Sequence, residues 1–190
     1  MINELIVKNR SYRSFTSQKI TQDELNQMME CGRLGAATKN SQAVKYALIT
    51  DADLCRNIFP YTAWAGAIEW NPTIDVAPVA YIAMCGDPDL MVTKEYLYFD
   101  MGVSAQNILL KASEMGYGGC ILGAFNKVKV KELLGLEERY DISILIALGD
   151  PNERVVLTDA VDGNTTYYRD EENVHHVPKR SIEELTILKK

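Results

Sequence analysis

Apolar residues recur every three or four positions in two long parts of the chain, the spacing that predicts amphipathic helices. The first helix is expected to begin after Thr21, because Thr21 and Glu24 have the spacing of a capping box, and to end near Leu34. The second is the longest and runs from about Tyr96 to Met115. Its apolar face is expected to contain Met101, Ala105, Ile108, Leu109, Ala112 and Met115.

Shorter elements are expected around these helices. Apolar runs bounded by turn residues predict strands at Tyr46 to Thr50, Val79 to Cys85 and Ile142 to Leu148, and a short strand or an extended turn at Cys120 to Leu122. Short helices are expected at Ile2 to Lys8, at Asp53 to Phe59, and from the N-cap residue Asn126 to Leu134. Periodicity alone leaves the class open between α/β and α+β, with some antiparallel pairing and one long central helix.

The character of the chain changes after Pro151. Residues 152–190 are mostly polar, with apolar content only around residues 155–157 and 182–188, so they cannot form a core of their own. An arm that lies across a partner subunit would account for them, and a disordered tail is the alternative. We expect a single domain over residues 1–190, with about residues 152–190 as an extended C-terminal arm.

Composition and charge narrow the function classes. A formal net charge of −6 argues against binding to nucleic acid, which needs a basic surface. No stretch approaches the roughly 20 apolar residues of a membrane span, so a cytoplasmic protein is expected. The four cysteines are isolated, which does not favour a metal site, and Cys85 and Cys120 are expected to be buried. The two histidines, His175 and His176, lie on the polar arm and are expected at the surface.

The candidate chemistry lies in anion-binding residues. The chain contains no GxSxG, HExxH or phosphate-binding glycine motif. Arg10, Ser11 and Arg13 fall within four residues, and two guanidinium groups beside a hydroxyl suit a phosphate monoester. Two solvated surface arginines are the alternative. Lys179 and Arg180 form a second, weaker basic pair near the end of the chain.

Two further segments could contact a planar ring. The first is a polar island between a predicted helix and strand, with Ala37, Thr38, Asn40 and Gln42. Its amides carry donors and acceptors that could match the edge of a flavin or nucleobase, although an ordinary connecting loop explains it equally well. The second is residues 116–123, whose glycines permit close approach of a ring to the backbone. By itself this segment is only a helix end followed by a turn.

Taken in order, these segments resemble the nitroreductase family. Residues 10–15, Arg-Ser-Tyr-Arg-Ser-Phe, match the family's Arg-Ser-x-Arg-x-Phe motif. Residues 37–46 partly match its Pro-Ser-x-x-Asn-x-Gln-Pro-Trp-x-Phe segment, although Ala43 and Val44 replace Pro-Trp. The stretch from Asp100 to Gly119 is similar to the family's Asp-x-Gly…Gly-Leu-Gly stretch, and residues 177–180 resemble its C-terminal basic segment.

The resemblance implies an α+β fold with a central, mainly antiparallel sheet flanked by helices. It also implies a homodimer that exchanges its C-terminal arms and binds FMN between the subunits. The residues that would then hold the FMN phosphate are Arg10, Ser11, Arg13, Lys179 and Arg180. Those that would reach the flavin from the other subunit are Ala37, Thr38 and Asn40, with Gln42 nearby. Those that would line one face of the ring are Ile121, Leu122 and Gly123.

The implied function is that of an FMN-dependent oxidoreductase. NADH or NADPH would transfer a hydride to flavin N5 and leave, and a nitroaromatic, quinone or similar small acceptor would then be reduced at the same place. This ping-pong cycle needs no catalytic side chain, because the flavin carries the chemistry. Two alternatives are a narrower flavin enzyme (a dehalogenase, enone reductase or dehydrogenase) and a non-enzymatic protein that stores or senses FMN. Tyr61, Trp64 and Trp70 would wall the substrate space, although either tryptophan could instead pack in the core.

Overall fold

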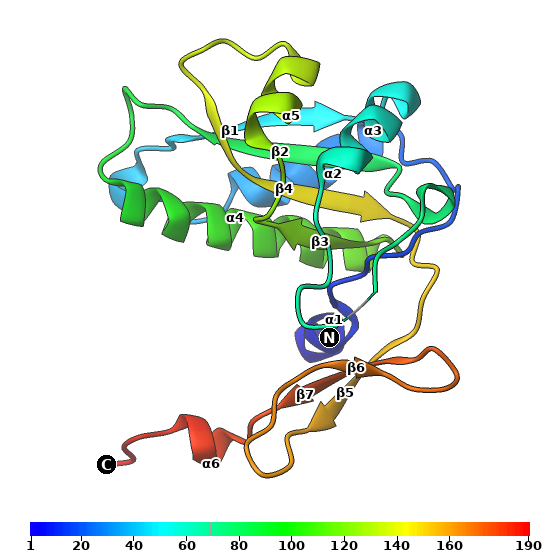
Figure 1. Cartoon of the computed structure of the whole chain (residues 1–190). Helices are drawn as coiled ribbons and strands as arrows, with labels where there is room; N and C mark the ends of the chain where they lie inside the picture. Colours follow the sequence, from blue (N-terminus) through cyan, green and yellow to red (C-terminus); the bar gives the residue numbers. More distant parts are fainter. Residues whose placement is uncertain (69) are drawn as a thin grey trace.

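The computed structural model describes residues 1–68 and 70–190. Its centre is a four-stranded sheet in the order β1-β2-β4-β3, in which every neighbouring pair is antiparallel. The strands are β1 (Val44–Ile49), β2 (Ala80–Gly86), β3 (Gly118–Leu122) and β4 (Asp141–Gly149). Helices packed on an antiparallel sheet confirm the α+β class (Figure 1).

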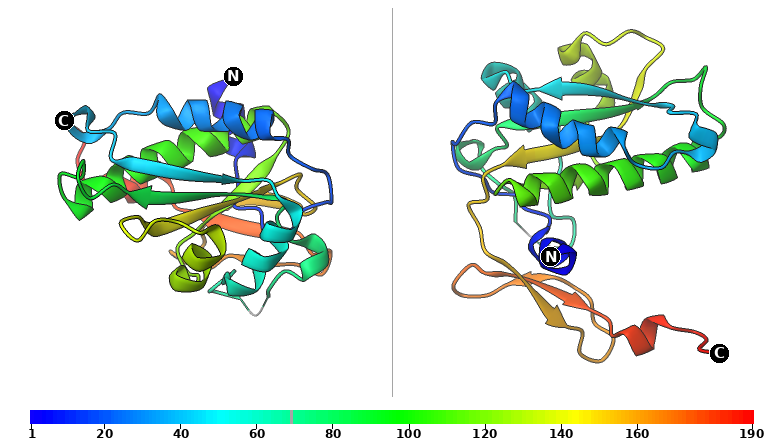
Figure 2. Two further views of the ribbon diagram at one scale, coloured as in Figure 1. Left: turned by 90° about the horizontal axis from the view of Figure 1, so that it is seen from above. Right: turned by 180° about the vertical axis from the view of Figure 1, so that it is seen from behind.

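Helices cover both faces of this sheet. α2 (Gln22–Arg33) and α4 (Lys94–Glu114) pack on one face, and α3 (Ala52–Ile58) and α5 (Lys127–Leu134) pack on the other (Figure 2). Successive residues of β2 therefore enter two different cores, one containing Ala80, Ile82 and Met84, the other Tyr81, Ala83 and Cys85. Burial on both faces explains why the strand sequences are continuous apolar runs.

Local signals set the helix ends as predicted. Thr21 Oγ1 accepts the Glu24 N–H at 3.2 Å, and the Glu24 carboxylate accepts the Thr21 N–H at 2.8 Å, so the expected capping box is present. The Asn126 side chain caps α5 by accepting the N–H of Lys129 at 3.1 Å. The same helix ends at Gly135, which has a φ of +59° and can adopt that conformation without strain.

The segment after α1 (Ile2–Lys8) lies along the edge of β3. The Tyr12 N–H donates to the Gly119 carbonyl at 3.0 Å. A Cβ at Gly118 would lie 2.4 Å from Cδ2 of Tyr12, and a Cβ at Gly119 would lie 2.5 Å from the carbonyl oxygen of Ala147. These two glycines, which we expected to admit a planar ring, therefore admit other parts of the protein. Their effect is to bring the N-terminal basic segment close to the sheet.

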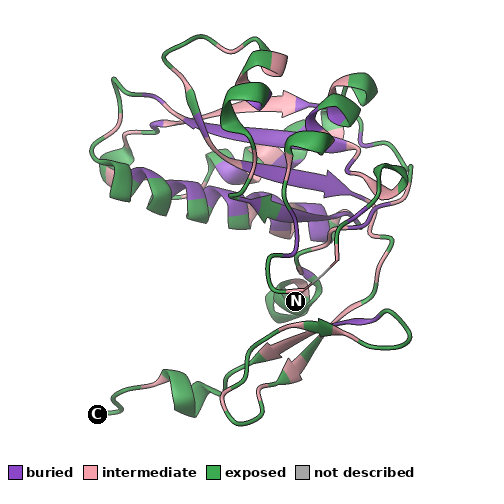
Figure 3. Ribbon diagram, in the orientation of Figure 1, coloured by how far each residue is buried: buried purple, intermediate pink, exposed green. Residues whose placement is uncertain are grey.

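After β4 the chain leaves the layered body as an arm (Figure 1). The arm holds a three-stranded sheet in the order β5-β7-β6 and a short helix: β5 (Val155–Asp159), β6 (Tyr168–Arg169), β7 (His175–Lys179) and α6 (Ile182–Leu185). Most of its residues are exposed or half-buried (Figure 3). Its exposed apolar side chains include Val161, Ile182, Leu185, Ile187 and Leu188. The arm thus combines ordered strands with uncovered apolar side chains.

Candidate functional site

A cavity of about 390 Å³ lies where the N-terminal segment, α4, β3 and the arm meet. This volume is within the usual range for small-molecule sites. Five residues predicted to bind the cofactor line the cavity, although they come from distant parts of the sequence: Arg10, Ser11, Arg13, Ile121 and Lys179. The fold therefore brings the first and the last basic segments of the chain to one place.

The two arginines of the N-terminal segment line this cavity, and nearby carboxylates neutralise little of their positive charge. Arg10 donates to the Ile6 carbonyl near the end of α1, and its Nε is buried without a hydrogen-bond partner among the described residues. Arg13 donates to the Ser11 carbonyl at 3.2 Å, and its guanidinium carbon lies 5.5 Å from the centre of the Tyr167 ring. Burial lowers the pKa of Arg10, so a bound anion would relieve the cost of burying this charge.

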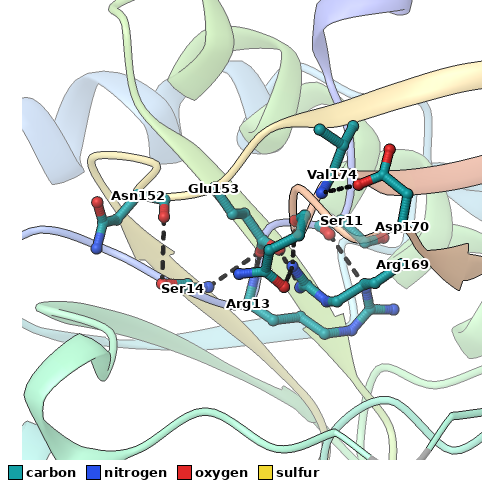
Figure 4. Close-up of polar contacts among 9 residues, drawn as sticks. Ser11, Arg13, Ser14, Asn152, Glu153, Arg169, Asp170 and Val174 are labelled. Carbon is teal, nitrogen blue, oxygen red and sulfur yellow. Dashed lines mark hydrogen bonds and ion pairs between the residues drawn. The ribbon is translucent and has the colours of Figure 1, made fainter.

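Glu153 holds the arginine segment against the arm (Figure 4). One of its carboxylate oxygens accepts the backbone N–H groups of Arg13 and Ser14, and the other forms an ion pair with Arg169. The side chains of Glu153 and Arg169 are only 3% and 10% exposed. The guanidinium carbon of Arg169 also lies 4.1 Å from the centre of the Trp70 ring. One buried carboxylate therefore connects the N-terminal segment, the arm and the loop that carries Trp70.

The expectation that both histidines lie at the surface is wrong for His175. This residue is 2% exposed, lines the cavity, and has its ring centre 5.2 Å from that of Tyr167. Burial, followed by the charges of nearby arginines, lowers the pKa of His175 and favours its neutral form. His176 is half-buried, and its Nε2 lies 2.7 Å from Oδ2 of Asp170.

The C-terminal basic pair is divided between two environments. Lys179 lines the cavity with the N-terminal arginines. Arg180 instead donates to the Gly163 carbonyl at 2.8 Å and pairs with Glu184 at 3.3 Å. Only the first residue of the pair is therefore placed with the predicted phosphate ligands.

The amide-bearing loop has a strained backbone. It contains the 3-10 turn Thr38–Asn40, and three of its non-glycine residues have φ between +50° and +53°: Lys39, Asn40 and Gln42. Such conformations persist only where the surroundings hold them, and they concentrate at functional sites. Here the buried Asp100 of α4 holds the loop, because its Oδ1 accepts the N–H and the hydroxyl of Thr38 at 2.9 and 3.0 Å.

This loop is separate from the arginine cavity within one chain. Ala37, Gln42 and Asp100 line a smaller cavity of about 180 Å³. In the part of the chain that the structure describes, the two cavities have no lining residue in common. The two predicted halves of the site are therefore not joined by a single subunit.

The three residues expected at the ring face differ in exposure. The Ile121 side chain is exposed and lines the arginine cavity, whereas Leu122 is buried in the core. Gly123 is exposed, and a Cβ built there would meet no atom within 4 Å. Ile121 can thus offer a side chain, and Gly123 an open backbone surface. Trp64, which we considered for the substrate space, is buried in the second core.

A second cavity of about 340 Å³ lies between α5, the start of α4 and the start of β4. Two of its cations are already neutralised, because Lys131 pairs with Asp141 and Arg139 pairs with Asp87 and another aspartate. It is therefore a weaker candidate for binding an anion. Over residues 1–68 and 70–190, no three His, Cys, Asp or Glu side chains gather as a metal site requires, and no helix is long and apolar enough to cross a membrane.

Several residues in the cavity or beside it could not be identified from the sequence. Glu153, Tyr167 and His175 stand in an arm without clear periodicity, so no local pattern distinguishes them. Gln106 lines the cavity from α4, where it is one polar position of a long helix. One residue of the site did carry a sequence signal: Asp100 belongs to the motif Asp100-Met101-Gly102. The motif did not reveal that the Asp100 carboxylate contacts the polar loop.

The sequence is similar to those of several oxidoreductases. The sequence model of the nitroreductase family matches residues 6–150. The NADPH-flavin oxidoreductase of Vibrio harveyi is 26% identical over 164 residues, a match that covers 79% of this chain. The matched part spans 65% of the Vibrio protein, slightly less than two thirds of its length.

Two solved structures share the fold. A candidate nitroreductase from Desulfovibrio desulfuricans, in complex with FMN, has a TM-score of 0.74 at 20% identity and is covered over 96% of its length by 100% of this chain. The NADPH:FMN oxidoreductase of Vibrio harveyi, complexed with NAD⁺, has a TM-score of 0.67 at 22% identity, with 89% of this chain and 76% of the other covered. At these identities the likeness establishes the fold alone.

Proposed function

The chain belongs to the nitroreductase family, and we propose that it is an FMN-dependent oxidoreductase that uses NADH or NADPH to reduce a small electron acceptor such as a nitroaromatic or a quinone. The observation that carries this proposal is the cationic cavity formed by both ends of the chain. Support comes from the Vibrio harveyi relative, an NADPH-flavin oxidoreductase, and from a structural neighbour in complex with FMN. The functional unit would be one domain over residues 1–190 with its C-terminal arm.

The cavity suits the phosphate end of FMN. Arg10, Arg13 and Lys179 line it, and no carboxylate side chain does so among the described residues. Arginine binds phosphate oxygens in pairs, and the unpartnered Nε of Arg10 adds a buried donor for such an anion. We therefore assign the phosphate to these three cations and Ser11. Arg180 is outside this set, because the arm already binds its guanidinium.

A partner subunit would supply the second half of the site. On α4, Phe99 and Val103 are 72% and 41% exposed, and a Cβ on Gly102 between them would meet no atom within 4 Å. If two copies of α4 packed antiparallel about a two-fold axis near Val103, the partner subunit's Asp100 would lie beside Gln106, because position 103 is midway between 100 and 106. Asp100 holds the strained loop, and Gln106 lines the arginine cavity. This packing would place the loop of one subunit over the cavity of the other.

The roles left to the protein are binding and orientation. When bound, FMN would supply the redox chemistry between NAD(P)H and the acceptor. In this chain, the cations would hold the phosphate, while Ile121 and the backbone at Gly123 would contact one face of the ring. Asn40 and Gln42 would reach its polar edge from the partner subunit. No side-chain acid or base is required in this scheme.

Steady-state kinetics of the full-length protein with FMN tests the proposal. Because donor and acceptor would occupy the same space in turn, double-reciprocal plots for NADPH or NADH at several fixed quinone concentrations should give parallel lines. Intersecting lines would show that both substrates bind together and would contradict the shared site. Retention of FMN without oxidation of either nucleotide, whether a quinone or a nitroaromatic is added, would indicate an FMN-storing protein instead.

A further inference from the structure

His175 is an imidazole buried beside the arginine cavity. It lines the arginine cavity, and its Nδ1 is buried without a hydrogen bond among the described residues. Buried polar groups are nearly always paired, so an unpaired one in a cavity is available to a ligand. The Nδ1 of the adjacent His176 also lacks a hydrogen bond among the described residues, but His176 does not line the cavity, its Nε2 contacts Asp170, and its ring stacks on Tyr168 with centres 4.7 Å apart.

The position of this imidazole is fixed by its surroundings. β7 is the central strand of the arm's sheet, between β5 and β6. The His175 N–H donates to the Arg154 carbonyl at 2.8 Å, and the ring packs against Tyr167 at an angle of 48°. A side chain held in this way needs little reorganisation to contact a ligand.

The charged and titratable groups that act on His175 come from several segments. They are Arg13 from the N-terminal segment, Glu153 from the segment after β4, Arg169 from β6 and His176 from the same strand. Burial and the two arginines lower the pKa of His175 below its ordinary value of about 6.5, and the carboxylate only partly opposes them. The imidazole is therefore neutral in the free protein at pH 7 to 8. An anion in the cavity would act in the opposite direction and favour the protonated ring.

We propose that His175 is a ligand of the FMN phosphate and takes up a proton from solvent when that phosphate binds. The proposal rests on the assignment of this cavity to FMN. It identifies a titratable ligand in addition to the permanently charged arginines. Because the bound form carries the extra proton, FMN affinity should rise as the pH falls from 8 toward 6.5. Riboflavin, which has no phosphate, should show neither the proton uptake nor the rise in affinity.

Calorimetry can measure the proton directly. FMN and riboflavin would each be titrated into the flavin-free full-length protein at pH 7.5, in two buffers that differ in ionisation enthalpy. The wild type and the control His176→Asn should take up a fraction of a proton with FMN and none with riboflavin. His175→Asn keeps a donor near the position of Nδ1 but cannot be protonated, so it should bind FMN without proton uptake. His175→Ala should lose about tenfold in FMN affinity at pH 6.5, the loss expected for one charge-assisted hydrogen bond.

The outcomes separate this proposal from the proposed function. Proton uptake by His175→Asn equal to that of the wild type would overturn the role of His175 while leaving the FMN site intact. The same proton uptake with riboflavin as with FMN would also overturn it, because the phosphate would then not be responsible. Failure of the wild type to bind FMN at any pH would overturn the proposed function itself.

Discussion

Glu153→Gln tests whether one buried carboxylate holds the site together. The substitution keeps the side-chain shape and one carbonyl oxygen but removes the negative charge opposite Arg169. That guanidinium is 10% exposed, so its charge would stay buried without a counter-charge. Three contacts remain to it: hydrogen bonds to the backbone carbonyl and the side-chain Oδ1 of Asn173, each at 3.2 Å, and the face of Trp70. These place the cost at the lower end of the range for a broken buried pair, about 3 kcal/mol.

This cost should appear in the thermal stability and in the arm. In a chain of this length, about 3 kcal/mol corresponds to a fall in Tm of roughly 6–12 °C. The glutamine amide has only one acceptor oxygen, so its NH2 group would face either Arg169 or the N–H groups of Arg13 and Ser14, and the arm should loosen and become more sensitive to limited proteolysis. Circular dichroism would follow Tm, and mass spectrometry of the first cleavage products would locate the exposed segment.

Two further variants make this test specific. Glu171→Gln removes an exposed carboxylate from the same arm and should leave Tm unchanged. The double variant Glu153→Gln/Arg169→Met should recover part of the lost stability, because it no longer buries an unpaired charge. A Tm for Glu153→Gln within 2 °C of the wild type, with unchanged proteolysis, would refute the reasoning.

Three other predictions concern the cavity, the subunit interface and the core. Arg13→Ala should lower FMN retention in the purified protein. The control Arg33→Ala, at an exposed arginine paired within α2, should not lower it. Equal FMN occupancy in the two variants would show that Arg13 does not bind the phosphate. Gly102→Leu should produce monomers in analytical ultracentrifugation and reduce FMN retention. The control Gln27→Leu, at an exposed position, should leave the oligomeric state and FMN retention unchanged. A Gly102→Leu dimer with full flavin would exclude subunit packing through this face of α4. Burial raises the pKa of Cys55 to about 12, so iodoacetamide at pH 8 should modify this thiol only after unfolding, and its rapid labelling in the native protein would contradict its position in the core.

The layered body could be predicted because its signals are local. The capping box at Thr21 and Glu24, the cap at Asn126 and the apolar runs each act within a few residues, so the predicted elements differ from the observed ones mainly by one or two residues at their ends. The strands of the arm could not be predicted in this way. β5 pairs in parallel with β7, twenty residues later, and β6 has only two residues, so neither pairing leaves a periodic pattern in the sequence.

The cavity was predicted in part, for a similar reason. Arg10, Ser11 and Arg13 form a compact motif, and chemistry alone suggests an anion. Glu153 and His175 lie beside the N-terminal segment, which is about 140 to 160 positions earlier in the chain. No spacing rule connects residues so far apart. His175 was expected at the surface because its neighbours are polar, whereas Tyr167 and the N-terminal segment bury it. Tertiary contacts therefore determined the burial that local polarity failed to predict.

The most direct test of the central claim is the visible absorption spectrum of the purified protein during anaerobic titration with NADPH and then NADH. The proposed function predicts an oxidised flavin spectrum that bleaches on addition of at least one of the two nucleotides and returns when a quinone is added. A flavin spectrum that neither nucleotide changes would contradict the oxidoreductase assignment. A protein that remains colourless after incubation with FMN would contradict the assignment of the arginine cavity to this cofactor.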